Sequence, residues 1–317
     1  MKKIFLSVCI SLFSFMAFAQ DCDLPIGIAF YTNSPQTIPS SSQRIVANKL
    51  RQILTANGVS ANFGIHTFAL VPEYEVIGKS VTPGPPKQIV YQLQVSLKVL
   101  NAADELVFSA FTKEVNGVGN TEAAAVNDAI KRIGNKDKGV EVFMGQVRQK
   151  IIKYYDNNFE KILAKAQMLA KTRKYEESLN LLLTVPECCK GYERALIEVM
   201  QVWQSHINLE GQKLLMKAKA VWASGQNAET AIEAAEILAQ IDPESFSYSD
   251  AEQMLAEIKA KAGEGNVWDV NMKKYDDSIS IEQQRIAAAK EVALAYAQNQ
   301  QPTQNLIFAD GKQVPLQ

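Results

Sequence analysis

The clearest pattern in the chain is a strict alternation of apolar and polar residues over residues 88–100. Ile89 and every second residue as far as Val99 are apolar, and Gln, Ser and Lys side chains occupy most of the positions between them. An alternation with this period predicts a β-strand that has one face on a core and the other in water. A turn at residues 101–104 then predicts an antiparallel partner strand over residues 105–115.

Two shorter apolar runs, at residues 24–31 and 63–71, predict buried strands earlier in the chain. The stretch over residues 73–87 contains Gly78 and several prolines, so we expect it to form an irregular excursion. Together with the hairpin described above, the two runs predict a small sheet.

Apolar residues at helical spacing predict a helix over residues 43–56, for which Ser41 or Ser42 would be the N-cap. The Asn-Gly pair that ends at Gly58 suits a left-handed C-terminal cap. The order strand, helix, strand, hairpin and then a further helix predicts a sheet with helices packed on one face.

The motif GxGxT, from Gly117 through Gly119 to Thr121, leads into an alanine-rich helix that Thr121 would cap and that ends at Ile133. This motif and the order of elements resemble the small accessory domains of periplasmic envelope proteins, such as the flagellar T-ring protein, the curli secretion lipoprotein and the N-terminal domain of TolB. The resemblance covers about residues 24–133. It implies a module for assembly or docking rather than an enzyme.

The second half of the chain, over residues 140–297, has the apolar spacing of helices. Its first part is expected to form one long helix or two, with a break at residues 156–158. Two stretches, residues 165–186 and 214–243, resemble tetratricopeptide helix pairs, in which small residues let helices approach closely and aromatic residues close the interface. The residues that carry this packing pattern are Ala166, Tyr175, Ser178, Ala218, Trp222, Ala231 and Pro243.

Further helices are expected over residues 192–206, 249–261 and 279–297, so that the helical half forms a degenerate array of stacked pairs. The sequence as a whole therefore predicts an α+β fold. Its expected parts are a signal peptide at residues 1–19, an α+β domain at 20–138, a helical domain at 139–299 and a tail at 300–317.

The start of the chain has the features of an export signal. Two lysines follow Met1, an apolar run covers residues 4–15, and an A-x-A cleavage site ends at Ala19. No other stretch approaches 18 apolar residues, so we expect no transmembrane span after cleavage. The protein is therefore expected in the periplasm, in association with an outer membrane, or outside the cell.

The tail ends in an apolar segment that contains Leu306, Ile307 and Phe308 and follows a polar spacer. Two interpretations stay open from the sequence. Either this segment and a second apolar run at residues 314–316 form a hairpin against the surface of their own chain, or the tail adds a strand to the sheet edge of a neighbouring molecule.

The cysteines do not form a full disulfide framework. Cleavage of the signal peptide removes Cys9, so that Cys22, Cys188 and Cys189 remain. An export compartment would permit Cys22 to pair with one of the other two. The adjacent cysteines are therefore expected to be either two small buried apolar residues or one disulfide partner and one buried thiol.

Composition and motifs argue against several classes of function. The formal net charge is −1, which disfavours nucleic acid as a partner, and only two histidines are present, which disfavours histidine-based metal or triad chemistry. His66 is expected to be structural or solvent-facing, and His206 is expected to end a helix, where a positive charge is favoured. No catalytic, metal-binding or cofactor-binding residue is singled out, and we expect no cofactor.

The sequence therefore favours a non-enzymatic exported scaffold or adaptor that binds other envelope or surface proteins, and a homo-oligomer stays open. One alternative is a module that binds a cell-wall glycan or small ligand in a groove between the two halves, lined by exposed aromatics such as Tyr74, Trp203 or Trp268. The other is a hydrolase with two carboxylates about 5–9 Å apart in a deep pocket.

Overall fold

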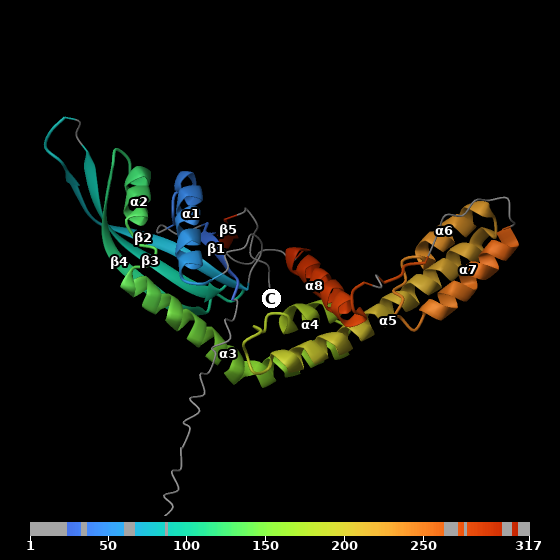
Figure 1. Cartoon of the computed structure of the whole chain (residues 1–317). Coiled ribbons are helices and arrows are strands. Elements are labelled where there is room, and N and C mark those ends of the chain that lie inside the picture. The colour runs from blue at the N-terminus through green and yellow to red at the C-terminus, as the bar shows by residue number, and fades with distance from the viewer. Residues whose placement is uncertain are drawn as a thin grey trace, which may run out of the picture.

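The computed structural model describes residues 24–32, 37–59, 67–85, 88–262, 272–275, 278–299 and 306–309. A five-stranded sheet with helices forms one end of the molecule, and a long helical arm extends from it (Figure 1). The predicted α+β class is confirmed.

The sheet has the strand order β4-β3-β2-β1-β5. Strands β1 and β2 are parallel, and the other neighbours are antiparallel. The strands are β1 (Ile26–Tyr31), β2 (Phe68–Val81), β3 (Ile89–Asn101), β4 (Val107–Gly119) and β5 (Leu306–Phe308). The last strand therefore comes from the other end of the chain and completes the sheet beside the first.

Three helices, α1 (Ser40–Ala56), α2 (Glu122–Lys131) and the first half of α3 (Lys138–Lys171), share one core with the sheet. The alternating apolar residues of β3, from Tyr91 to Val99, are buried in this core as the sequence predicts. On the other face of β3, Lys98 forms an ion pair with Glu73 on β2, and Leu100 is buried in a small apolar cluster with residues of β1, β2 and β5.

The prediction of an irregular segment over residues 73–87 is wrong for its first part, because β2 continues as a strand to Val81. Beyond Leu70, the described residues give β2 a full neighbour only in β3, apart from a single bridge between Thr37 and Glu73. A proline is tolerated on such an edge, and the glycine at position 78 is accommodated where the register with β3 shifts.

The caps of the first two helices are partly as predicted. Helix α1 begins at Ser40 after Pro39, so neither Ser41 nor Ser42 is its N-cap. Ser42 is instead buried, and its hydroxyl donates a hydrogen bond to the carbonyl oxygen of Ala123 at 3.4 Å. The left-handed stop at Gly58 is confirmed by its φ of +70°. The hydroxyl of Thr121 caps α2, as expected.

The glycines of the GxGxT motif allow α2 to lie directly on β4. A Cβ atom at Gly117 would lie 1.9 Å from the carbonyl oxygen of Ala125, and one at Gly119 would lie 2.7 Å from the Cβ of Ala124. The motif is thus explained by close packing between a strand and a helix.

Helix α3 is continuous over 34 residues, without a break at residues 156–158. Its first half packs on β4, where the ring of Phe143 lies 6.1 Å from that of Phe111. Its second half begins the arm. The hydrophobic core therefore runs on through the boundary expected at residue 139, and α3 belongs to both halves.

The arm continues with α4 (Tyr175–Leu182) and α5 (Tyr192–Gly225). Helices α3 and α5 run in the same direction. Glu160 of α3 pairs with Arg194 of α5, and further along both helices Gln167 of α3 donates a hydrogen bond to Glu198 of α5. The helix expected over residues 192–206 is only the first half of α5, so the prediction of its end at residue 206 is wrong.

The second half of α5 forms a separate core with α6 (Ala228–Leu238) and α7 (Tyr248–Ala262). Helix α8 (Ile281–Asn299) returns to α4 and α5 and buries Ala289, Ala293 and Ala297. Among the described helices, none is both long and apolar enough to span a membrane.

Candidate functional sites on the arm and at its junction with the sheet

The residues of the first predicted helix pair lie between α3 and α4. Ala166 and Ser178 are fully buried, and the hydroxyl of Ser178 donates a hydrogen bond to the carbonyl oxygen of Ala166 at 2.8 Å. The half-buried ring of Tyr175 lies 6.0 Å from that of His206 on α5. These side chains hold helix against helix.

The residues of the second predicted pair lie in the core of α5, α6 and α7, where Ala218, Trp222 and Ala231 are buried. Asn227 caps α6 through a reciprocal pair of hydrogen bonds with Thr230. The half-buried Pro243 lies in the loop between α6 and α7, with no role seen beyond ending the helix pair.

The loop between α6 and α7 presents Phe246 to solvent, with 82% of the residue exposed. The loop itself is firmly held against α5. The backbone N–H of Phe246 donates to Oδ1 of Asn208 at 3.0 Å, and Nε2 of Gln204 donates to the carbonyl oxygen of Glu244 at 2.9 Å. An exposed aromatic ring on a loop that is held in place by hydrogen bonds is a feature of protein-binding surfaces.

Two further contacts fix this loop. A Cβ atom at Gly211 of α5 would lie 2.2 Å from the hydroxyl of Ser245, so the loop touches the backbone of the helix. The hydroxyl of Tyr275 donates to the carboxylate of Asp242 at 2.8 Å. Burial, with the neighbouring Asp242 charge, raises the pKa of Tyr275, so that the phenol stays a donor at ordinary pH.

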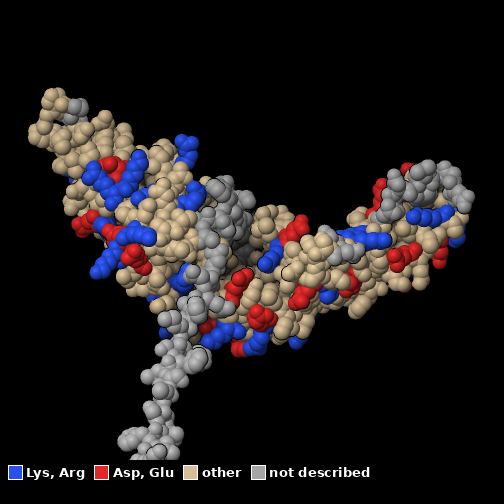
Figure 2. All heavy atoms as spheres, in the orientation of Figure 1, with Lys and Arg blue, Asp and Glu red and all other residues tan. Residues whose placement is uncertain are grey.

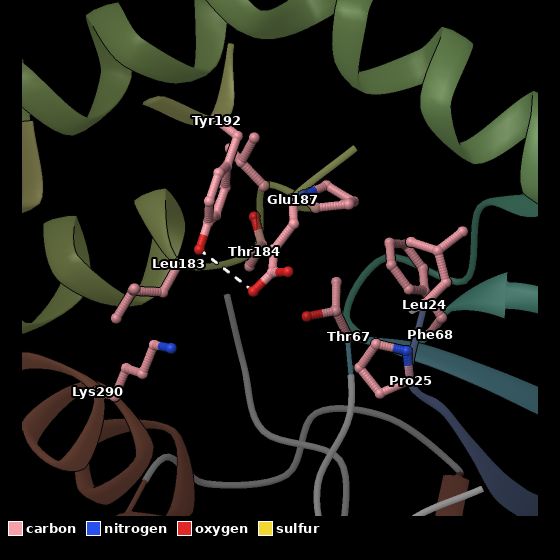
Figure 3. Close-up of a pocket in the computed structure, with 11 residues that line it drawn as sticks. Leu24, Pro25, Thr67, Phe68, Leu183, Thr184, Glu187, Tyr192 and Lys290 are labelled. Carbon is pink, nitrogen blue, oxygen red and sulfur yellow. Dashed lines mark hydrogen bonds between the residues drawn. The ribbon is translucent and has the colours of Figure 1, made fainter. Parts of the chain in front are cut away.

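A cavity of about 330 Å³ lies where the arm meets the sheet (Figure 3). Its walls come from the segments that lead into β1 and β2, from the loop between α4 and α5, from the first turn of α5 and from α8. Leu24 and Phe68 form one apolar side, and buried Val185 and Pro186 lie in the loop that faces them.

The polar groups of this junction cavity are Thr67, Thr184, Glu187, Tyr192 and Lys290. The hydroxyl of Tyr192 donates a hydrogen bond to Oε1 of Glu187, at 3.4 Å. Burial, followed by the charge of Glu187, raises the pKa of Tyr192, so the hydroxyl keeps its proton for this bond. Among the described residues, no ion pair joins Lys290 to a carboxylate.

A second cavity, of about 280 Å³, lies on the arm beside His206 and Tyr296. Four of the six Lys, Arg and Glu side chains that line it are paired, Lys174 with Glu177 at 3.0 Å and Lys213 with Glu210 at 2.7 Å. Burial lowers the pKa of His206, which favours its neutral form. This cavity therefore offers few free charges to a ligand.

Two of the three aromatic residues expected to line a groove for a glycan are buried instead. Tyr74 is 9% exposed and donates a hydrogen bond to Glu122, and Trp203 is 5% exposed within the core. Both are buried because they lie on the apolar faces of β2 and α5. Trp268 and His66 lie outside the described residues.

The cysteines at the junction differ from each other. Cys188 is disulfide-bonded, whereas Cys189 is a free and buried thiol whose pKa burial raises to about 12. A bond between the two adjacent cysteines is thereby excluded. Cys22, the partner suggested by the sequence, lies outside the described residues, and its pairing stays a prediction.

The apolar tail segment lies on its own chain. Leu306, Ile307 and Phe308 form β5, which pairs with Tyr31, Phe30 and Ala29 of β1. Of the two interpretations, the structure shows the intramolecular one, with Leu306 and Phe308 buried.

Sequence reasoning missed the exposed ring of Phe246 and the presence of Glu187 and Lys290 around one cavity. An isolated aromatic residue in a polar loop after Asp242-Pro243 is a signal for the first. For the second no linear signal exists, because the two residues are about a hundred positions apart. The part of the chain that the structure describes contains no cluster of three or more metal-ligating side chains.

Comparison with known proteins adds little to this geometry. No protein family pattern and no curated protein matches the sequence. One solved structure, a minor lipoprotein from Acinetobacter baumannii, is similar at 16% identity over 34% of this chain and 89% of that one, with a TM-score of 0.23. A TM-score this low carries no inference about fold or function.

Proposed function

We propose that the protein is an exported adaptor or scaffold that binds another envelope or surface protein through its helical arm. The observation that carries the proposal is the exposed ring of Phe246 on a loop held by Gln204 and Asn208. Ordering a loop costs conformational entropy, and a loop that is already fixed does not incur that cost when a partner binds. Aromatic side chains of this kind are the usual anchors of protein interfaces.

The surroundings of the loop favour a protein partner. Gln204 contacts both Glu244 in the loop and Arg285 in α8, so the start of α8 meets the loop at the middle of α5. Ile279 and Ile281, which lead into and begin α8, are also about half exposed. Basic and acidic side chains are interspersed over the visible face of the molecule (Figure 2), as on surfaces that bind proteins rather than nucleic acid.

The test compares three immobilised proteins in envelope extract from the source cells. Phe246→Ala is the test variant, and Leu294→Ala, on the exposed side of α8, is the control that removes a similar apolar group elsewhere. We expect a specific protein to be retained by the wild type and by the control, and to be retained more than tenfold less by Phe246→Ala. Equal retention by all three, or no retained protein, would contradict the proposal.

A further inference from the structure

The junction cavity has the position and size of a small-molecule site. Such sites commonly lie between structural units and have volumes of about 300–1,000 Å³. This cavity, of about 330 Å³, lies between the sheet and the arm, and segments from both ends and the middle of the chain line it. It shares no residue with the loop that carries Phe246.

The cavity combines an apolar interior with charges at its edge. Leu24, Phe68 and Val185 are buried and turn apolar groups to it, so it can accept an apolar side chain from water. Glu187 and Lys290 are both exposed. Glu187 lies in the loop that precedes α5, and Lys290 lies on helix α8. Figure 3 shows them directed at the cavity from different sides.

The two charged side chains line the same cavity without forming a described ion pair with each other. Glu187 has its carboxylate oriented by the hydroxyl of Tyr192, and no ion pair between Glu187 and Lys290 exists in the described structure. A carboxylate favours an ammonium group, and a lysine favours a carboxylate. A molecule that carries both, with an apolar body between or beside them, would find an opposite charge for each group and apolar walls for its body.

We propose that the junction cavity binds a zwitterionic amino acid or dipeptide with an apolar side chain. The ammonium group of the ligand pairs with Glu187 and its carboxylate pairs with Lys290. The apolar side chain lies against Leu24, Phe68 and Val185. Binding at this place would also link the sheet to the arm, because the two charged contacts lie on the arm and much of the apolar contact lies on the sheet.

The test is isothermal titration of the purified protein with alanyl-leucine, its N-acetylated form and its C-amidated form. We expect the free dipeptide to bind most tightly. Glu187→Gln should weaken binding of the free dipeptide about fivefold and leave binding of the N-acetylated form unchanged. Lys290→Met should likewise weaken the free dipeptide about fivefold and leave the C-amidated form unchanged.

The control is Glu233→Gln, an exposed carboxylate on α6 whose loss should change none of the affinities. Glu187, Lys290 and Glu233 are all exposed, so the variants are expected to fold, and circular dichroism checks this. The proposal is overturned if the free dipeptide does not bind the wild type. It is equally overturned if Glu187→Gln weakens the free and N-acetylated forms to the same extent.

Discussion

At the scale of single residues, the glycines show most directly how packing determines the sequence. Gly117 has no room for a side chain because the backbone of α2 lies against it, whereas Gly145 on the exposed side of α3 has no neighbouring atom within 4 Å of an added Cβ. The same residue type therefore stabilises the fold at one position and costs stability at the other.

Gly117→Ala is predicted to destabilise the protein by about 3 kcal/mol, because the added methyl group forces α2 away from β4. Gly145→Ala, the matched control, is predicted to stabilise it by about 1 kcal/mol, because alanine is the better helix former. Urea unfolding followed by circular dichroism measures both. Equal effects of the two substitutions would show that the close approach at Gly117 is not needed.

At the scale of elements, the start of α3 is fixed by one carboxylate with two partners. Asp137 accepts a hydrogen bond from the backbone N–H of Gly139 at 2.9 Å and pairs with Lys113 of β4 at 2.5 Å. The hydrogen bond from Lys113 is the main cause that lowers the pKa of Asp137. The carboxylate thus anchors the helix that joins the sheet to the arm.

Asp137→Asn keeps an N-cap acceptor but loses the ion pair, so it is predicted to cost about 0.5–1 kcal/mol at pH 7. Asp137→Ala also loses the cap and should cost about 1 kcal/mol more. Because the folded pKa lies below the unfolded value of about 3.9, the stabilisation is present above that value and is lost as the pH falls through the folded pKa.

The measurement is urea unfolding of the wild type and Asp137→Asn at pH 7 and pH 2.5. The difference between them should shrink at the lower pH. A difference that stays constant across this range would mean that the charge of Asp137 contributes nothing.

The sequence predicts elements whose signals are local. The alternation in β3, the cap at Thr121 and the stop at Gly58 are all confirmed, because each depends on residues within one element. The continuation of β2 past Pro72 was not foreseeable, since it depends on which side of that strand lacks a neighbour.

The candidate sites likewise divide into features with a local sequence signal and features that depend on distant parts of the chain. The small residues between α3 and α4, such as Ala166 and Ser178, stand out in the sequence because helix pairing has a fixed spacing. Glu187 and Lys290 come together only because α8 returns to α4, and no pattern along the chain records that return.

At the scale of the whole molecule, the two larger of the three hydrophobic clusters among the described residues share one helix. The first core includes the sheet, α3, α4 and the first half of α5, and the second lies between α6, α7 and the second half of α5. Since α5 is the main shared element, the outer core can lose its packing without exposing the first.

Ala235→Asp places a charge in the outer core and is predicted to remove hydrogen-exchange protection from α6 and α7, whereas protection of β3 stays unchanged. Glu233→Ala, on the exposed side of α6, is the control and should change neither region. Hydrogen exchange followed by mass spectrometry measures the protection of α6 and α7 and that of β3. A parallel loss of protection in β3 would mean that the molecule unfolds as one cooperative unit.

The pairing of β5 with β1 has a consequence for how the molecule is made. Strand β1 comes near the beginning of the chain and β5 comes nearly three hundred residues later, so β1 keeps an open edge throughout synthesis. Open edges attract foreign strands and proteases. Because only residues 306–308 cover that edge in the described structure, a chain cut before them is expected to keep it exposed to foreign strands and proteases.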